Sequence, residues 1–235
     1  QHNEIPKIQV VFNFQRMPLM AAKKTARKKV PKTLAVINAD NCTGCEACVT
    51  ACQAENNIPV VGEDEMAKGR EMQWIRIERY WEGEYPNAKL SFIPMMCQHC
   101  DAAPCETVCP VGATYHNQDG LNAQIYNRCI GTRACAVYCP YEVRYFNYYD
   151  HEWDSPLEQQ LNPDVTVRGK GVMEKCTFCI QRIRQAKDVA KDDDRRRVQD
   201  GEMQPACVQT CPTKALVFGD RNDPESQVSL PMEDP

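Results

Sequence analysis

Fifteen cysteines in this chain of 235 residues are gathered into four short runs, and this spacing constrains the fold more than any other feature. The first three runs occupy residues 42–52, 97–109 and 129–139, and the fourth is divided between residues 176–179 and 207–211. A proline follows the last cysteine of every run except the first. The sequence therefore predicts four thiolate-rich sites built from repeated loops.

The spacing within each run suits an iron-sulfur cluster. Gaps of two residues allow one tight loop to place three thiolates around a cluster, with backbone N–H groups directed at its sulfides. The fourth cysteine lies about one helical turn further on. In bacterial two-cluster ferredoxins, which share this pattern, the fourth cysteine ligates the other cluster of the pair. We therefore expect the runs to work in pairs.

Thr132 occupies the second cysteine position of the third run, between Cys129 and Cys135. A threonine hydroxyl stays protonated at neutral pH, whereas a cysteine thiolate forms readily. Because the fourth iron would lack its ligand, we predict one 3Fe-4S cluster beside three 4Fe-4S clusters. This count uses all fifteen cysteines. The alternative is a Thr132 alkoxide that keeps the fourth iron in place.

Two other uses of cysteine fit less well. An odd number of cysteines in proline-terminated runs is not typical of a disulfide framework. Tetrahedral zinc needs only pairs of Cys-x-x-Cys, so runs of three or four cysteines would leave surplus thiols.

Composition sets limits on the partners. The net charge of -4, counted without clusters, does not indicate nucleic-acid binding. The apolar stretches are well short of the roughly 18 residues that a membrane-spanning helix needs. We therefore expect any quinone or membrane chemistry to come from a partner.

The pattern predicts an α+β fold of two bacterial-ferredoxin-like modules with two clusters each. Residues 32–95 and 166–223 are expected to form the outer module from both ends of the chain, and residues 96–150 the inner one. The other predicted segments are an N-terminal extension or linker (1–31), a hairpin inserted at about 58–95, a connecting loop (151–165) and a C-terminal tail (224–235).

Within these modules we predict two hairpins, at residues 113–126 with a turn at Asp119–Gly120 and at residues 73–93. The second hairpin is expected to cover a cluster, with Trp74, Tyr80 and Trp81 packed inside it. His99 is interpreted as a packed loop residue or hydrogen-bond donor rather than a proton acceptor. The remaining predictions are strands at 34–38 and 215–218 and helices at 46–55 and 180–191.

Four stretches are longer and more specific than the cysteine runs: residues 69–77 (GREMQWIRI), 126–133 (YNRCIGTR), 162–168 (NPDVTVR) and 172–179 (VMEKCTFC). With them, the chain from Lys32 to Asp223 resembles the four-cluster iron-sulfur subunits of the dimethyl sulfoxide reductase superfamily. Within that group it is most similar to the iron-sulfur part of alternative complex III and of the related quinone reductase complex.

The resemblance implies a ligand set for each cluster. The three 4Fe-4S clusters would be held by Cys42, Cys45, Cys48 and Cys211; by Cys176, Cys179, Cys207 and Cys52; and by Cys97, Cys100, Cys105 and Cys139. The 3Fe-4S cluster would be held by Cys129, Cys135 and Cys109.

The resemblance also implies a function without bond chemistry on this chain, which would relay electrons from quinol toward a downstream acceptor. The 3Fe-4S cluster would face an integral membrane quinol-binding subunit. The cluster of the first run would face a large molybdopterin-type subunit, which lacks its cofactor in alternative complex III. Further expectations are c-type cytochrome subunits and a peripheral membrane location on the periplasmic side. The alternatives are the electron-transfer subunit of a quinone reductase complex, the electron-input subunit of a molybdopterin reductase, and a structural iron-sulfur scaffold.

Overall fold

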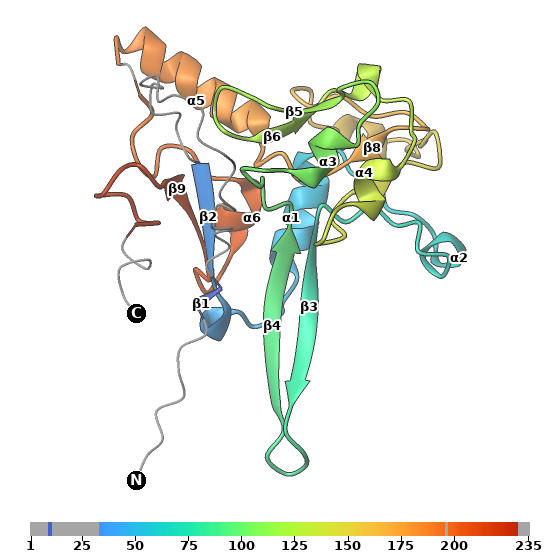
Figure 1. Ribbon diagram of the computed structural model, residues 1–235, viewed down its shortest axis with the longest axis vertical. Coiled ribbons are helices and arrows are strands. Elements are labelled where there is room, and N and C mark those ends of the chain that lie inside the picture. Colours follow the sequence, from blue (N-terminus) through green and yellow to red (C-terminus); the bar gives the residue numbers. More distant parts are fainter. Residues whose placement is uncertain (1–8, 11–32, 196, 230–235) are drawn as a thin grey trace.

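Short strands and helices surround the cysteine loops in the computed structural model, which describes residues 9–10, 33–195 and 197–229 (Figure 1). The described strands form one three-stranded sheet, β1–β2–β9, and three two-stranded sheets, β3–β4, β5–β6 and β7–β8. These small mixed elements agree with the predicted α+β class. The predicted extension, residues 1–31, lies outside the described residues apart from β1 (Gln9–Val10).

Residues from opposite ends of the described chain build one half of the molecule. β2 (Thr33–Asn38) pairs antiparallel with β9 (Leu216–Asp220), with Ile37 opposite Leu216. α1 (Ala47–Glu55), which carries the end of the first cysteine run, lies against α6 (Ala206–Thr210) of the fourth run. The first and last cysteine runs are thereby brought side by side.

The middle of the chain builds the other half. α3 (Pro104–Thr107) lies against α4 (Ala134–Val137), so the second and third cysteine runs meet. β5 (Thr114–His116) pairs with β6 (Asn122–Gln124), and the Asn117 side chain accepts N–H groups of the turn between them. The predicted hairpin at 113–126 is confirmed. β7 (Tyr145–Phe146) pairs with β8 (Met173–Glu174) and closes this half.

The prolines after the cysteine runs set the lengths of the helices. A residue before proline is driven out of the helical region, as Cys211 is with φ −65° and ψ 110°. α3, α4 and α6 therefore have only four, four and five residues. α1 has Gln53 where the other runs have proline, and it continues for nine residues through Cys52. The missing proline also changes which groups donate hydrogen bonds to the cysteine sulfurs.

The hairpin of β3 (Ile75–Glu82) and β4 (Lys89–Met96) projects far from the body (Figure 1). Its base is buried, and the Phe92 ring lies against Gly44 of the first cysteine loop, where a Cβ would come within 2.5 Å of the ring. The hairpin is confirmed, and its inner half covers that loop. The predicted packing of Tyr80 and Trp81 is wrong: they are 46% and 70% exposed because the strands have left the body at that point.

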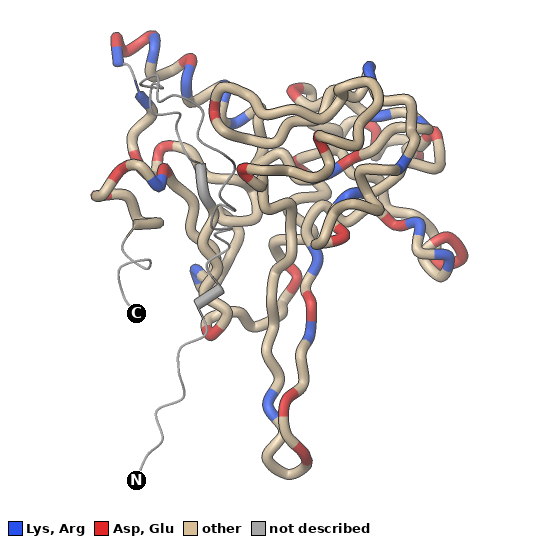
Figure 2. The backbone as a smooth tube through the Cα atoms, viewed as in Figure 1, with Lys and Arg blue, Asp and Glu red and all other residues tan. Residues whose placement is uncertain are grey.

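The remaining described elements occupy the periphery. Figure 2 shows that charged residues are spread over the hairpin, the outer loops and α5. No helix in the described ranges is both long enough and apolar enough to cross a bilayer. These peripheral elements are η1 (Ala39–Asn41), α2 (Glu63–Met66), η2 (Tyr126–Arg128), η3 (Leu157–Gln160) and α5 (Ile180–Asp192), the last of which confirms the helix expected at 180–191.

A buried ion pair connects the two halves. Arg168 donates to the Glu174 carboxylate at 2.9 Å, and the two side chains are 1% and 0% exposed. Arg168 also donates to the backbone oxygen of Asn56 at the end of α1. The same carboxylate accepts from Trp74 at the hairpin base and from Asn147. One pair therefore fixes α1, the hairpin and β8 relative to one another.

Replacing Arg168 by methionine would leave the Glu174 carboxylate buried without its cation. We expect the free energy of unfolding to fall by roughly 3–5 kcal/mol, measured by anaerobic guanidinium chloride unfolding of the cluster-loaded protein. The control is Arg79→Met, which removes an ion pair with Glu46 whose side chains are 58% and 50% exposed. That control should cost at most about 1 kcal/mol. Equal losses in both variants would contradict a central role for the buried pair.

Candidate metal centres

All fifteen cysteines lie in the described part of the chain, and all are free thiols. Among the described residues, no three His, Cys, Asp or Glu side chains come close enough together to hold a single metal ion. The thiols instead lie near one another in four wider groups, which line two hollows or affect one another's pKa values. They are named here the first group (Cys42, Cys45, Cys48, Cys211), the second (Cys52, Cys176, Cys179, Cys207), the third (Cys97, Cys100, Cys105, Cys139) and the fourth (Cys109, Cys129, Cys135, with Thr132).

The first group lines a hollow of about 310 Å³, open space at its mouth included. Ile77 of β3 and Pro94 of β4 close one side of it. Burial, together with repulsion from the thiolates of Cys42, Cys211 and Cys45, raises the pKa of Cys48 to about 11. The hairpin base thus covers thiols from both ends of the chain.

The second group is the most deeply buried. Burial is the main reason that the pKa of Cys52 lies well above its ordinary value, and Cys176, Cys207 and Cys179 add to the effect. All four side chains are buried. Such a group can hold four thiolates only with a positive centre between them, because isolated charges are costly in a buried site.

The third group combines the second cysteine run with the last cysteine of the third run. Burial, together with the nearby thiols of Cys97, Cys105 and Cys139, raises the pKa of Cys100 to about 11. Three of these thiols come from one loop and its helix α3, and the fourth lies after α4. The contact between α3 and α4 is what brings them together.

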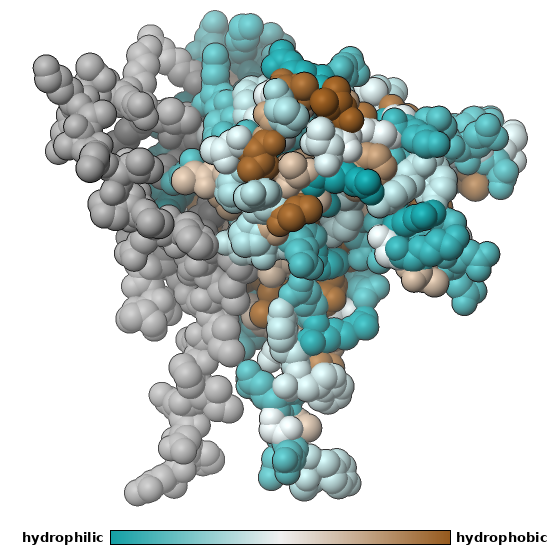
Figure 3. Space-filling model, turned by 45° about the vertical axis from the view of Figure 1, so that its right-hand side comes forward, coloured by the Kyte–Doolittle hydropathy of each residue, from teal (hydrophilic) through white to brown (hydrophobic). Residues whose placement is uncertain are grey.

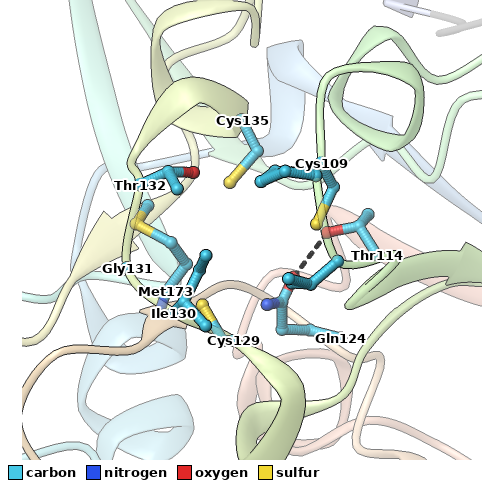
Figure 4. Close-up of a pocket in the computed structure, with 11 residues that line it drawn as sticks. Cys109, Thr114, Gln124, Cys129, Ile130, Gly131, Thr132, Cys135 and Met173 are labelled. Carbon is cyan, nitrogen blue, oxygen red and sulfur yellow. Dashed lines mark hydrogen bonds between the residues drawn. The ribbon is translucent and has the colours of Figure 1, made fainter.

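The fourth group surrounds a hollow of about 270 Å³, open space included. Figure 4 shows the sulfurs of Cys109, Cys129 and Cys135 around this hollow, with Thr132 on the remaining side. Gly131, at φ +70°, allows the loop to pass so close to residue 171 that a Cβ would lie 2.3 Å from the Gly171 oxygen. The threonine therefore stands where a fourth thiol would complete the site.

Backbone N–H groups point at the sulfurs, as an anionic cluster requires. Cys109 and Cys211 each begin the sequence Cys-Pro-x-x-Ala, and each sulfur accepts from the alanine N–H four residues later, at 3.2 Å and 3.3 Å. Although burial acts to raise it, these and other backbone N–H groups hold the pKa of both thiols below the ordinary value. The residues present therefore fit thiolate-bound clusters.

Asn56 replaces this backbone arrangement where the proline is missing. Because α1 continues through Cys52, the N–H of residue 56 is used within the helix and bonds the Cys52 oxygen. The Asn56 side chain, in a residue only 2% exposed, instead faces the Cys52 sulfur at 3.5 Å and the Cys179 sulfur at 3.8 Å. Sequence reasoning missed this residue, although the absent proline was a visible signal.

The groups form a row. The pKa of Cys207 in the second group is raised by burial, by the thiols of its own group and also by Cys48 of the first group. The pKa of Cys176 in the second group is raised by burial and also by Cys97 of the third group. Arg144 lies between the third and fourth groups, since its charge acts on both Cys105 and Cys135. The order is therefore first, second, third, fourth.

His99 is a packed residue within this row. It is 7% exposed and stacks on Phe178 with ring centroids 4.3 Å apart, joining the loops of the third and second groups. Burial, with the nearby charges of Lys175 and Arg144, lowers the pKa of His99 well below its ordinary value. The expectation of a packed loop residue is confirmed. The two buried cations were missed, although the position of Lys175 directly before Cys176 was a possible signal.

Comparison with known proteins agrees with these sites. Models described as 4Fe-4S dicluster domain match residues 41–113 and 88–155. The iron-sulfur cluster-binding subunit of menaquinone reductase from Nitratidesulfovibrio vulgaris is 43% identical over 197 residues, which cover 82% of this chain and 77% of that one. This chain belongs to the family of 4Fe-4S dicluster iron-sulfur subunits.

Other relatives of this iron-sulfur subunit are equally informative. A putative dimethyl sulfoxide reductase iron-sulfur subunit from Halobacterium salinarum is 37% identical, over 83% of this chain and 68% of that one. An Hdr-like menaquinol oxidoreductase iron-sulfur subunit from Archaeoglobus fulgidus is 39% identical, over 77% of this chain and 63% of that one. The comparisons do not single out alternative complex III.

Asn56→Leu keeps the size of the side chain but removes its N–H donor to the second group. We expect this iron-sulfur subunit to hold the second-group cluster about 10–100-fold less tightly, as with other residues that support metal ligands. The measurement is the rate at which a chelator removes iron, followed by visible absorbance. Asn87→Leu, at the tip of the hairpin, is the matched control. Unchanged iron loss in Asn56→Leu would show that the amide is not needed.

Proposed function

We propose that this chain carries three 4Fe-4S clusters and one 3Fe-4S cluster and relays electrons from quinol in an alternative complex III-type oxidoreductase. The first, second and third groups would hold the 4Fe-4S clusters, and Cys109, Cys129 and Cys135 of the fourth group the 3Fe-4S cluster. The observation that carries the proposal is the row of four thiol groups with Thr132 in the last. The outer module would comprise residues 32–95 and 166–223, and the inner one residues 96–150.

The residues of the chain hold and insulate this path. When bound, the clusters supply one-electron transfer between neighbouring sites. Cysteine thiols fix their positions, and backbone N–H groups with the Asn56 amide stabilise negative charge on the sulfurs. Because the second group is buried, its covering side chains exclude water from the middle of the path.

The surface at the fourth group favours a membrane partner there. Ile130, Val137 and Tyr138, on the loop and helix of the third run, are 65%, 82% and 58% exposed. Figure 3 shows several hydrophobic residues, separated by more polar ones, on the upper part of the face in view. We assign this end to an integral membrane quinol-binding subunit, so that the chain would be peripheral to the membrane. The resemblance to alternative complex III would put it on the periplasmic side. The first group would face a large molybdopterin-type subunit, with c-type cytochrome subunits further along.

A second candidate follows from the names of the relatives. Besides the dimethyl sulfoxide reductase subunit, an arsenate respiratory reductase iron-sulfur subunit from a Shewanella species is 32% identical over 83% of this chain. The same row of sites would then pass electrons from quinol to a molybdopterin subunit that reduces a substrate. Copurification with a large subunit that contains molybdenum would favour this candidate over the first.

Electron paramagnetic resonance of the oxidised protein tests the fourth group. An oxidised 3Fe-4S cluster is paramagnetic and oxidised 4Fe-4S clusters are silent, so we expect about one spin and about fifteen irons per chain. Thr132→Cys supplies the missing thiol and should remove the signal while adding about one iron. Thr132→Ser, which keeps a hydroxyl, is the matched control and should keep the signal.

Two results would contradict the proposal. A silent wild-type protein with about sixteen irons would mean that Thr132 or water holds the fourth iron. A paramagnetic wild-type protein whose clusters are not reduced by a quinol through the membrane fraction would retain the cluster assignment but exclude quinol as the electron source.

A further inference from the structure

Arg144 is a buried cation placed between the third and fourth groups. It is 6% exposed and follows the last cysteine of the third run by five residues. Its Nη2 atom lies 3.0 Å from the Cys105 sulfur of the third group. On the other side, its Nη1 atom donates to Thr114 and Gln124, which both line the hollow of the fourth group. One guanidinium therefore contacts a thiol of the third group and the lining of the fourth.

The other acceptors of Arg144 are neutral. It donates to Asn122 Oδ1 at 2.6 Å, Gln124 Oε1 at 3.0 Å and Thr114 Oγ1 at 3.2 Å. These side chains come from β5 and β6 and hold the guanidinium fork in a fixed orientation. Among the hydrogen bonds of the described residues, none joins Arg144 to a carboxylate.

Arg168 shows what a buried arginine otherwise requires. Its charge is matched by Glu174 at 2.9 Å, and that pair contributes no net charge to the interior. Buried charges are rare without a counter-charge, because their desolvation is costly. The thiol that Arg144 contacts is that of Cys105, so the cluster that this sulfur holds, with the neighbouring fourth-group cluster, would be its counter-ion.

A fixed cation at this position has a definite redox consequence. A thiolate-bound cluster is anionic, and reduction adds a further negative charge. In the low dielectric of the interior, a nearby cation stabilises the reduced form more strongly than it would in water. Charge and hydrogen bonds to the sulfurs are among the features that set cluster potentials.

We propose that Arg144 raises the reduction potentials of both the third-group and the fourth-group clusters. The inference rests on the proposed cluster sites and names the residue that tunes them. The hydrogen-bonded guanidinium also links the Cys105 sulfur to Thr114 and Gln124, which line the fourth-group hollow. Asn122, Gln124 and Thr114 act as positioning residues for it.

The test is redox titration of the cluster-loaded protein, followed by electron paramagnetic resonance, with Arg144→Gln. Glutamine keeps hydrogen-bonding capacity and removes the charge. We expect each of the two clusters to become at least about tenfold harder to reduce, which is a fall of about 59 mV for a one-electron couple. Clusters of the first and second groups should move much less, because they lie further along the row.

Two further variants distinguish the charge of Arg144 from its contact with both groups and from nonspecific effects of substitution. Arg133→Gln removes an exposed cation beside Thr132, where solvent screens it, and should leave the potentials unchanged. Arg144→Lys keeps the charge on a single nitrogen, which cannot reach both the Cys105 sulfur and the side chains that line the fourth-group hollow. The potential of one cluster should therefore fall while that of the other is retained. If the Arg144→Gln protein does not assemble its clusters, the potentials of Arg144→Lys alone test whether Arg144 acts on both clusters.

The outcomes also distinguish this inference from the proposed function. Spin counting and iron analysis of each variant report whether the clusters are present, and the potentials report what Arg144 does to them. Unchanged potentials in an intact Arg144→Gln protein would overturn the inference and leave the cluster assignment standing. Unchanged potentials in Arg144→Lys would exclude the bridging role. Equal shifts in Arg133→Gln and Arg144→Gln would show that burial gives Arg144 no special effect.

Discussion

The mutual repulsion of closely placed thiolates is the constraint on which the rest of the structure depends. Each group gathers three or four cysteines from distant segments. Burial raises the pKa of every thiol in the second group, and neighbouring thiols raise those of Cys52, Cys176 and Cys207 as well. The helices that carry the ligands have four to nine residues, too short to be stable alone. Folding and cluster assembly are therefore expected to be coupled, as in other metal-dependent domains.

Positive charge is supplied to the sulfurs in three different ways. Backbone N–H groups after Cys109 and Cys211 provide it where proline ends the helix. The Asn56 amide provides it where the helix continues. Arg144 contributes a full charge at the junction of two groups, whereas the charge of Arg168 is balanced by Glu174. The interior thus has both neutral pairs for stability and an arginine matched only by thiols.

Local patterns accounted for most elements, because they depend on neighbours in the sequence. The Asp119–Gly120 turn, the strands at both ends and the helix after Cys179 all follow from short-range preferences. The prediction failed at Trp81, where an apolar side chain was assigned to packing although its strand projects beyond the body. Exposure along a hairpin depends on how far the base is buried, and the alternation of residues carries no information about that distance.

The sequence by itself determined the number of thiol-rich loops, the odd position of Thr132 and the family, because loop spacing and ligand chemistry are local properties. The tertiary structure decided which loops meet, through the pairing of β2 with β9 and the contact of α3 with α4. It also decided the roles of Asn56 and Arg144. Residue 144 is 39 positions from Cys105 in the sequence, and only the folded β5–β6 hairpin brings its guanidinium to that sulfur. Contacts of this kind depend on the packing of remote segments, which no local pattern records.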